Sequence, residues 1–144
     1  MAVFTKEYKS QPDSILSNVI ICPAVDLSTD NVVPVHCQVE DVLWDTGATN
    51  TLISKQVVDA LGLQAKNKVI ISSAGGDIES WTYIVHVILP TGTAELNVQA
   101  VLNDNPDYDV VIGMDIINTC DFCYTKKDGK RVFSLHHPSE KKHS

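Results

Sequence analysis

The sequence predicts a mainly β protein with one or two short helices. Residues from Thr93 to Leu102 alternate between apolar and polar side chains, as in a strand with one face in a core. Glycine-containing turns separate this segment from other strand-like runs. One further segment carries the start and stop signals of a helix. These three observations together predict the fold class.

The strands are predicted in order along the chain. In the alternating segment, the core face is expected to hold Ala94, Leu96, Val98, Ala100 and Leu102. Further strands are predicted over 69–73, 78–89, 121–125 and 131–137, separated by Ala74-Gly75-Gly76-Asp77, Thr91-Gly92 and Lys127-Asp128-Gly129. These turn sequences are typical of β-hairpins.

A helix is predicted from Ser54 to Gly62. Ser54 can cap its first turn, and Gly62 readily adopts the left-handed conformation that ends a helix. The apolar residues Val57, Val58 and Leu61 share one face. A second short helix is expected to begin near Met114.

Length and composition indicate one folded domain. The chain has 144 residues, and 44% hydrophobic residues are enough to build a core. We expect a loosely ordered N-terminal segment over 1–17, the domain over 18–137 and a polar tail over 138–144.

Charge and hydropathy exclude several partners. The formal charge of −7 argues against nucleic-acid binding, which depends on Lys and Arg. We find no apolar run long enough for a membrane span, and residues 1–17 lack a secretory signal. A cytoplasmic location with reduced cysteines is expected.

The pair Cys120 and Cys123 forms a C-x-x-C motif. Such a pair can hold zinc or perform redox chemistry, but no second pair of ligands stands at a suitable spacing. The two thiols are therefore expected to pack as small side chains. We predict no metal and no cofactor.

The segment 42–53 carries the most informative motif. A strand-like apolar run ends directly at Asp45, and Gly47 then permits a sharp turn. Burying a carboxylate needs hydrogen bonds or a proton, so this position requires a reason. From this segment alone, catalysis and a structural Asx-turn are equally good interpretations. Trp44 is expected to be a packed core aromatic.

A second segment favours catalysis. Residues 108–117 form an apolar strand that ends at Gly113 and leads into a short apolar helix. Together with Asp45-Thr46-Gly47-Ala48, it resembles the retropepsin-like aspartic peptidases. The resemblance covers about residues 18–135, in the family's order of catalytic loop, flap hairpin and glycine-helix element.

The resemblance implies a closed β-barrel or sandwich, with one lobe per chain in a twofold-symmetric dimer. It also implies that Asp45 is catalytic, that the Thr46 hydroxyl braces the paired loops and that the Gly47 backbone meets the substrate. Substrate contacts are expected from Ala48, Thr49, Gly75 and Gly76, the two last in the flap. Thr49 and Met114 replace an acid and an arginine of retroviral members, so bacterial and cellular members resemble the chain better.

The predicted function is hydrolysis of peptide bonds in a peptide or unfolded protein. Because the chain contains one Asp-Thr-Gly, a homodimer must supply the two carboxylates that activate water. One alternative is a catalytically silent, dimeric peptide-binding module on the same fold. A phosphohydrolase with an Asp nucleophile is disfavoured, because Gly47 stands where that chemistry needs a second acid.

Overall fold

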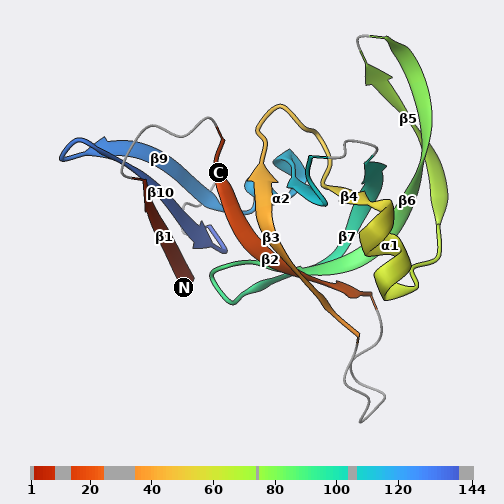
Figure 1. The fold of residues 1–144 in the computed structure, drawn as a ribbon, viewed down its shortest axis with the longest axis horizontal. Helices are drawn as coiled ribbons and strands as arrows, with labels where there is room; N and C mark the ends of the chain where they lie inside the picture. The colour runs from red at the N-terminus through yellow and green to blue at the C-terminus, as the bar shows by residue number, and fades with distance from the viewer. Residues whose placement is uncertain (1, 9–13, 25–34, 74, 104–106, 140–144) are drawn as a thin grey trace.

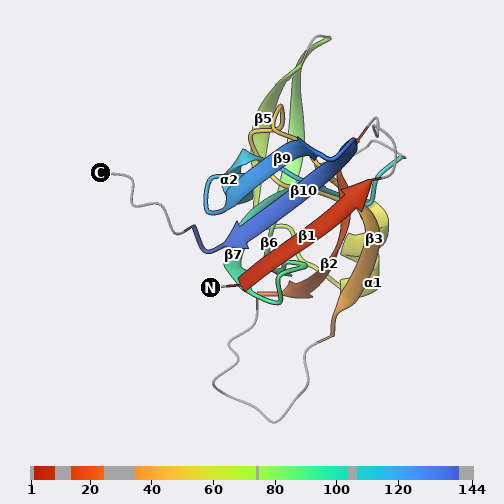
Figure 2. The same ribbon diagram turned by 90° about the vertical axis from the view of Figure 1, so that its left-hand side faces the viewer.

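The computed structural model describes residues 2–8, 14–24, 35–73, 75–103 and 107–139. Its strands form two sheets, and Figures 1 and 2 show the smaller sheet lying across one side of the larger. The described elements are β1 (Ala2–Tyr8), β2 (Leu16–Pro23), β3 (Cys37–Trp44), β4 (Leu52–Ser54), α1 (Lys55–Leu61), β5 (Asn67–Ser73), β6 (Gly76–Ile88), β7 (Ala94–Asn103), β8 (Val110–Ile112), α2 (Met114–Ile117), β9 (Asp121–Lys127) and β10 (Lys130–His137). The predicted mainly β class with short helices is confirmed.

The larger sheet has the strand order β2-β3-β8-β4-β7-β6-β5, and β2 also pairs with β6. Most pairs are antiparallel, whereas β3–β8 and β4–β7 are parallel. The smaller sheet has the order β1-β10-β9. The core lies between these layers, and its largest fully buried side chain is Phe133.

Both predicted helices are present. The Ser54 side chain accepts a hydrogen bond from the Val57 amide at 3.3 Å, and Gly62 ends α1 with a φ of 62°. Val57, Val58 and Leu61 are buried, as their spacing predicts. The helix α2 begins at Met114.

The alternation of β7 is interrupted, which corrects part of the sequence prediction. Val98 and Ala100 are buried, but Leu96 is 58% exposed and Ala94 also faces solvent. The β6–β7 register shifts by one residue at this point, and Asn97 has a φ of 56°. Such a bulge rotates the residues before it, so Leu96 leaves the core face.

The N-terminal segment is better held than predicted. Residues 2–8 form β1 and pair with β10 along their whole length, and the next strand begins at Leu16. Phe4 packs against Phe133, with ring centroids 6.0 Å apart. The folded part therefore begins well before Asn18, because apolar residues alternate with the polar ones that suggested a loose segment. Residues 9–13 lie outside the described residues.

The C-terminal end of the fold extends just beyond β10. The Ser139 amide donates to the Thr119 carbonyl at 2.9 Å, and the Ser139 hydroxyl donates to Asp121 at 2.5 Å. The predicted tail is therefore tied to the domain at Ser139. Its last residues, 140–144, lie outside the described residues. Within the described residues, no helix is long and apolar enough to cross a membrane.

Candidate active site

Asp45 lies where β3 ends, at the start of a loop over residues 45–51 that we call the Asp45 loop. Its amide donates to the Ile112 carbonyl at 2.9 Å, which fixes the residue against β8. One carboxylate oxygen accepts the Gly47 amide at 2.8 Å, and the Asp45 carbonyl accepts the Ala48 amide at 3.1 Å. The residue is half-buried, and the Gly47 amide orients its carboxylate. The Asx-turn geometry is present, and it also presents an oriented acid.

Gly113 lets α2 approach the Asp45 loop closely. A Cβ at this position would lie 2.6 Å from the backbone of Asn50 and 2.8 Å from the Ala48 carbonyl oxygen. Beyond it, the Met114 amide donates to Ala48 at 2.7 Å, and the Asp115 amide donates to Thr49 at 3.2 Å. Only glycine fits here without moving the loop, because the contacted atoms are backbone.

Asp115 is a supporting residue to which the sequence analysis assigned no role. Its carboxylate accepts the Thr51 hydroxyl at 2.8 Å and the Thr51 amide at 3.0 Å. Thr51 is fully buried, and its hydroxyl oxygen also accepts the Gly113 amide at 3.3 Å. No local sequence pattern signals this contact, because the two residues lie 64 positions apart. These hydrogen bonds, which we call the Thr51–Asp115 clasp, fix the C-terminal end of the Asp45 loop on α2.

The remaining predicted site residues divide into two groups. Thr46, Gly47 and Thr49 are exposed on the Asp45 loop, and Ala48 is half-buried. Gly75 and Gly76 instead lie at the tip of the β5–β6 hairpin, which Figure 1 shows projecting away from the loop. In the single chain, the structure therefore brings the first group together with Asp45 but leaves the second apart.

A hollow of about 380 Å³ lies beside Asp45. It is lined by residues of the Asp45 loop, the end of β3, the approach to β2 and β9: Ser14, Ile15, Leu43, Trp44, Asp45, Thr46 and Tyr124. Trp44 is only 4% exposed, so it is a packed aromatic, as expected. Its position makes it both a core residue and a wall next to the carboxylate.

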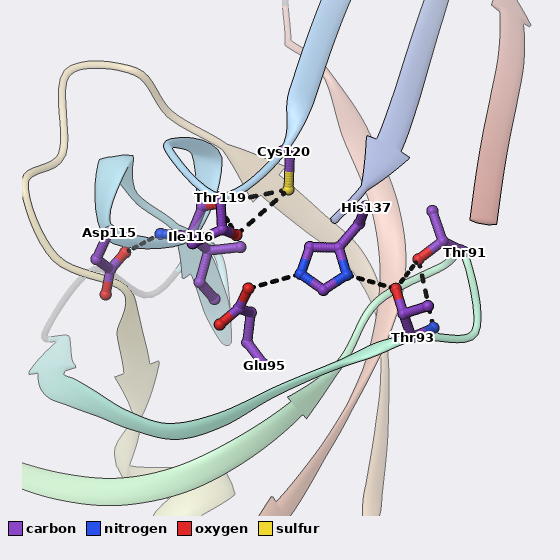
Figure 3. A network of polar contacts seen from close by, with 8 residues as sticks. All are labelled: Thr91, Thr93, Glu95, Asp115, Ile116, Thr119, Cys120 and His137. Atoms are coloured by element: carbon purple, nitrogen blue, oxygen red, sulfur yellow. Dashed lines mark hydrogen bonds and ion pairs between the residues drawn. The ribbon is translucent and has the colours of Figure 1, made fainter. Parts of the chain in front are cut away.

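A second polar network joins the two sheets near α2 (Figure 3). The buried His137 ring lies 2.6 Å from Glu95 through Nε2 and 2.6 Å from the Thr93 hydroxyl through Nδ1. His137 ends β10, whereas Glu95 lies in β7 and Thr93 just before it. The network thus fixes the end of the smaller sheet on the larger one.

The cysteines are free thiols. Cys120 is buried behind α2, where burial raises the pKa of its thiol to about 11, and its Sγ contacts the Ile116 carbonyl at 3.4 Å. Cys123 is exposed on β9. Across the described part of the chain, no group of three or more His, Cys, Asp or Glu side chains could hold a metal ion.

Comparison with protein-family models identifies the family of the chain. The family model described as "gag-polyprotein putative aspartyl protease" matches residues 35–119, which is more than half of the chain. The chain belongs to this family. The match spans the Asp45 loop, the β5–β6 hairpin and α2, whereas Ser14, Ile15 and Tyr124 of the hollow lie outside it.

The fold of the chain is also similar to those of solved structures. A retropepsin-like aspartic protease from Rickettsia conorii is similar, with 13% identity, a TM-score of 0.53, and coverage of 92% of this chain and 91% of that one. The EIAV protease complexed with the inhibitor HBY-793 is also similar, with 21% identity, a TM-score of 0.48, and coverage of 74% and 86%. A search of curated proteins finds no match. The predicted resemblance to retropepsin-like aspartic peptidases is confirmed.

Proposed function

We propose that the chain is an aspartic endopeptidase whose active site is completed by a second copy of itself. The observation that carries the proposal is Asp45, a half-buried carboxylate oriented by the Gly47 amide at the end of β3. The chain contains one Asp-Thr-Gly motif, whereas the proposed reaction needs two carboxylates. One chain therefore supplies half of a two-carboxylate site.

A twofold dimer supplies the other half. A symmetric pair places the same loop against itself, so the exposed Thr46 of each copy would brace the other across the axis. The pairing of β2 with both β3 and β6 supports the barrel-like lobe that such a dimer uses. One carboxylate of the pair removes a proton from water while the other donates a proton to the peptide carbonyl oxygen. Because the two acids share one proton, activity is expected at acidic pH.

The substrate is expected to lie extended between the Asp45 loop and the β5–β6 hairpin. Extended peptides are bound by backbone hydrogen bonds, and their side chains are read by alternating pockets. Gly47 would present backbone to the substrate, with Ala48 and Thr49 beside it. Ile71 and Ile78 are cross-strand partners near the hairpin tip, where Ile78 is 53% exposed. An apolar substrate side chain would cover this pair.

The test uses two copies of the chain joined by a flexible linker. In one hybrid, Asp45→Asn is introduced into a single half, which keeps the shape of the side chain but removes one acid. We expect the hybrid to lose nearly all cleavage of an unstructured peptide at about pH 5, while the tethered wild type remains active. Initial rates are measured at concentrations too low for tethered molecules to pair.

The possible results separate the candidate functions. A hybrid that keeps half of the wild-type rate would contradict the shared pair of acids, because each Asp45 would then work alone. An inactive tethered wild type whose melting temperature rises with a statine-type peptide would favour the silent peptide-binding module.

A further inference from the structure

Trp44 makes a directional contact that an aliphatic residue at this position could not make. Its indole Nε1–H donates to the Ser17 hydroxyl at 2.7 Å, and both side chains are buried. The β2–β3 register pairs Ser17 with Val42, so Ser17 and Trp44 are diagonal neighbours on one face. Aromatic side chains can reach a diagonal neighbour of this kind. The bond therefore spans the two strands directly beneath Asp45.

The Trp44 ring also packs against aromatic residues of the three-stranded sheet. Its centroid lies 5.5 Å from Phe133 of β10 and 6.1 Å from Phe122 of β9. Phe122 and Phe133 also pack on each other, with centroids 5.1 Å apart. The ring thus stands at the junction of the two sheets, between Ser17 on one side and an aromatic cluster on the other.

The backbone of Trp44 is fixed as well. Its amide donates to the Ile15 carbonyl at 3.0 Å, and the next amide, that of Asp45, donates to Ile112. These bonds hold the strand end in place. A hydrogen bond from the indole also restricts rotation of the end of β3 about the strand axis. Apolar packing alone restricts this rotation less strictly. That rotation decides where the adjacent carboxylate points.

We propose that Trp44 is a positioning residue for Asp45. By joining the end of β3 to Ser17 and to the three-stranded sheet, it sets the direction of the carboxylate. The role of this contact in catalysis rests on the function proposed above, whereas its effect on the geometry of Asp45 does not. The elements β2, β9 and β10 thereby contribute to the site although they lie outside the family match.

The test compares four single variants. Ser17→Ala removes the acceptor, and Trp44→Phe keeps an aromatic ring but removes the donor. Ser17→Thr keeps a hydroxyl and serves as the conservative rescue. Val58→Ala is the matched control, because Val58 is buried in α1 and its truncation lowers stability while the Trp44 donor and the Ser17 acceptor stay in place.

The first measurement does not depend on activity. Because the Gly47 amide donates to the Asp45 carboxylate, its NMR resonance reports the position of that carboxylate. We expect this resonance to move in Ser17→Ala and Trp44→Phe and to stay near its wild-type position in Ser17→Thr and Val58→Ala. An unmoved Gly47 resonance in both of the first two variants would overturn the proposal.

The second measurement is the kinetics of peptide cleavage. We expect kcat to fall about tenfold in Ser17→Ala and Trp44→Phe, with little change in KM. The double variant should be no worse than the poorer single variant, because both changes remove the same interaction. Equal kcat in Ser17→Ala and wild type would also overturn the proposal. If wild type cleaves no peptide while the Gly47 resonance still moves, the proposed peptidase function fails and the positioning of Asp45 by Trp44 stands.

Discussion

The Asp45 loop and the β5–β6 hairpin both carry glycines at the proposed substrate site, but their surroundings are opposite. Gly113, which lies between β8 and α2, packs so closely on the loop that a single added carbon would overlap with backbone. At the hairpin tip, a carbon added to Gly75 or Gly76 would meet nothing within 4 Å. The comparison indicates that the Asp45 loop is tightly packed and rigid, whereas the tip of the β5–β6 hairpin is open. Glycine provides close packing in the first region and freedom of the backbone in the second.

The largest effect is expected from Gly113→Ala. The new methyl group would push Asn50 and Ala48 away, so we expect a loss of about 1–3 kcal/mol in the free energy of unfolding and a strong loss of peptidase activity. Gly75→Ala is the matched control and should change stability by less than about 0.5 kcal/mol. Urea unfolding measures both. Equal losses of unfolding free energy in the two variants would contradict the difference in packing between the Asp45 loop and the hairpin tip.

A smaller effect is expected from Asp115→Asn, which tests the clasp at the other end of the loop. The amide that replaces one carboxylate oxygen cannot accept a hydrogen bond from Thr51, so the free energy of unfolding should fall by about 0.5–1.5 kcal/mol. Asp59→Asn alters an exposed acid on α1 that pairs with Lys55, where surface ion pairs contribute little. If the two variants prove equally stable in urea, Asp115 does not support the loop.

The smallest effect concerns the chemical reactivity of two thiols. Because burial raises the pKa of Cys120 to about 11, roughly one thiol in a thousand is ionised at about pH 8. Iodoacetamide should therefore modify the exposed Cys123 and spare Cys120, as measured by peptide mass mapping. In Gly113→Ala, faster modification of Cys120 would show that the support behind α2 has loosened. Rapid modification of Cys120 in the wild type would contradict the rigid packing of α2 and the Asp45 loop.

The sequence predicted those parts of the molecule that depend on local patterns. The cap at Ser54, the left-handed Gly62 and the apolar run ending at Asp45 each follow from neighbouring residues. The exposure of Leu96 could not be predicted, because it depends on a bulge in the pairing of β7 with a distant strand. The clasp between Thr51 and Asp115 joins residues 64 positions apart, so only the fold reveals it.

The three-stranded sheet and β2 extend the folding unit beyond the segment that matches the family. A fragment trimmed to the matched segment 35–119 would lose β1, β2, β9 and β10. β3 would then become an open sheet edge, and the indole of Trp44 would be exposed to water without Ser17, Phe122 and Phe133. Unpaired edges and wet aromatic surfaces favour aggregation. The sequence signature of the family is therefore shorter than the piece of chain that can be expected to stay soluble.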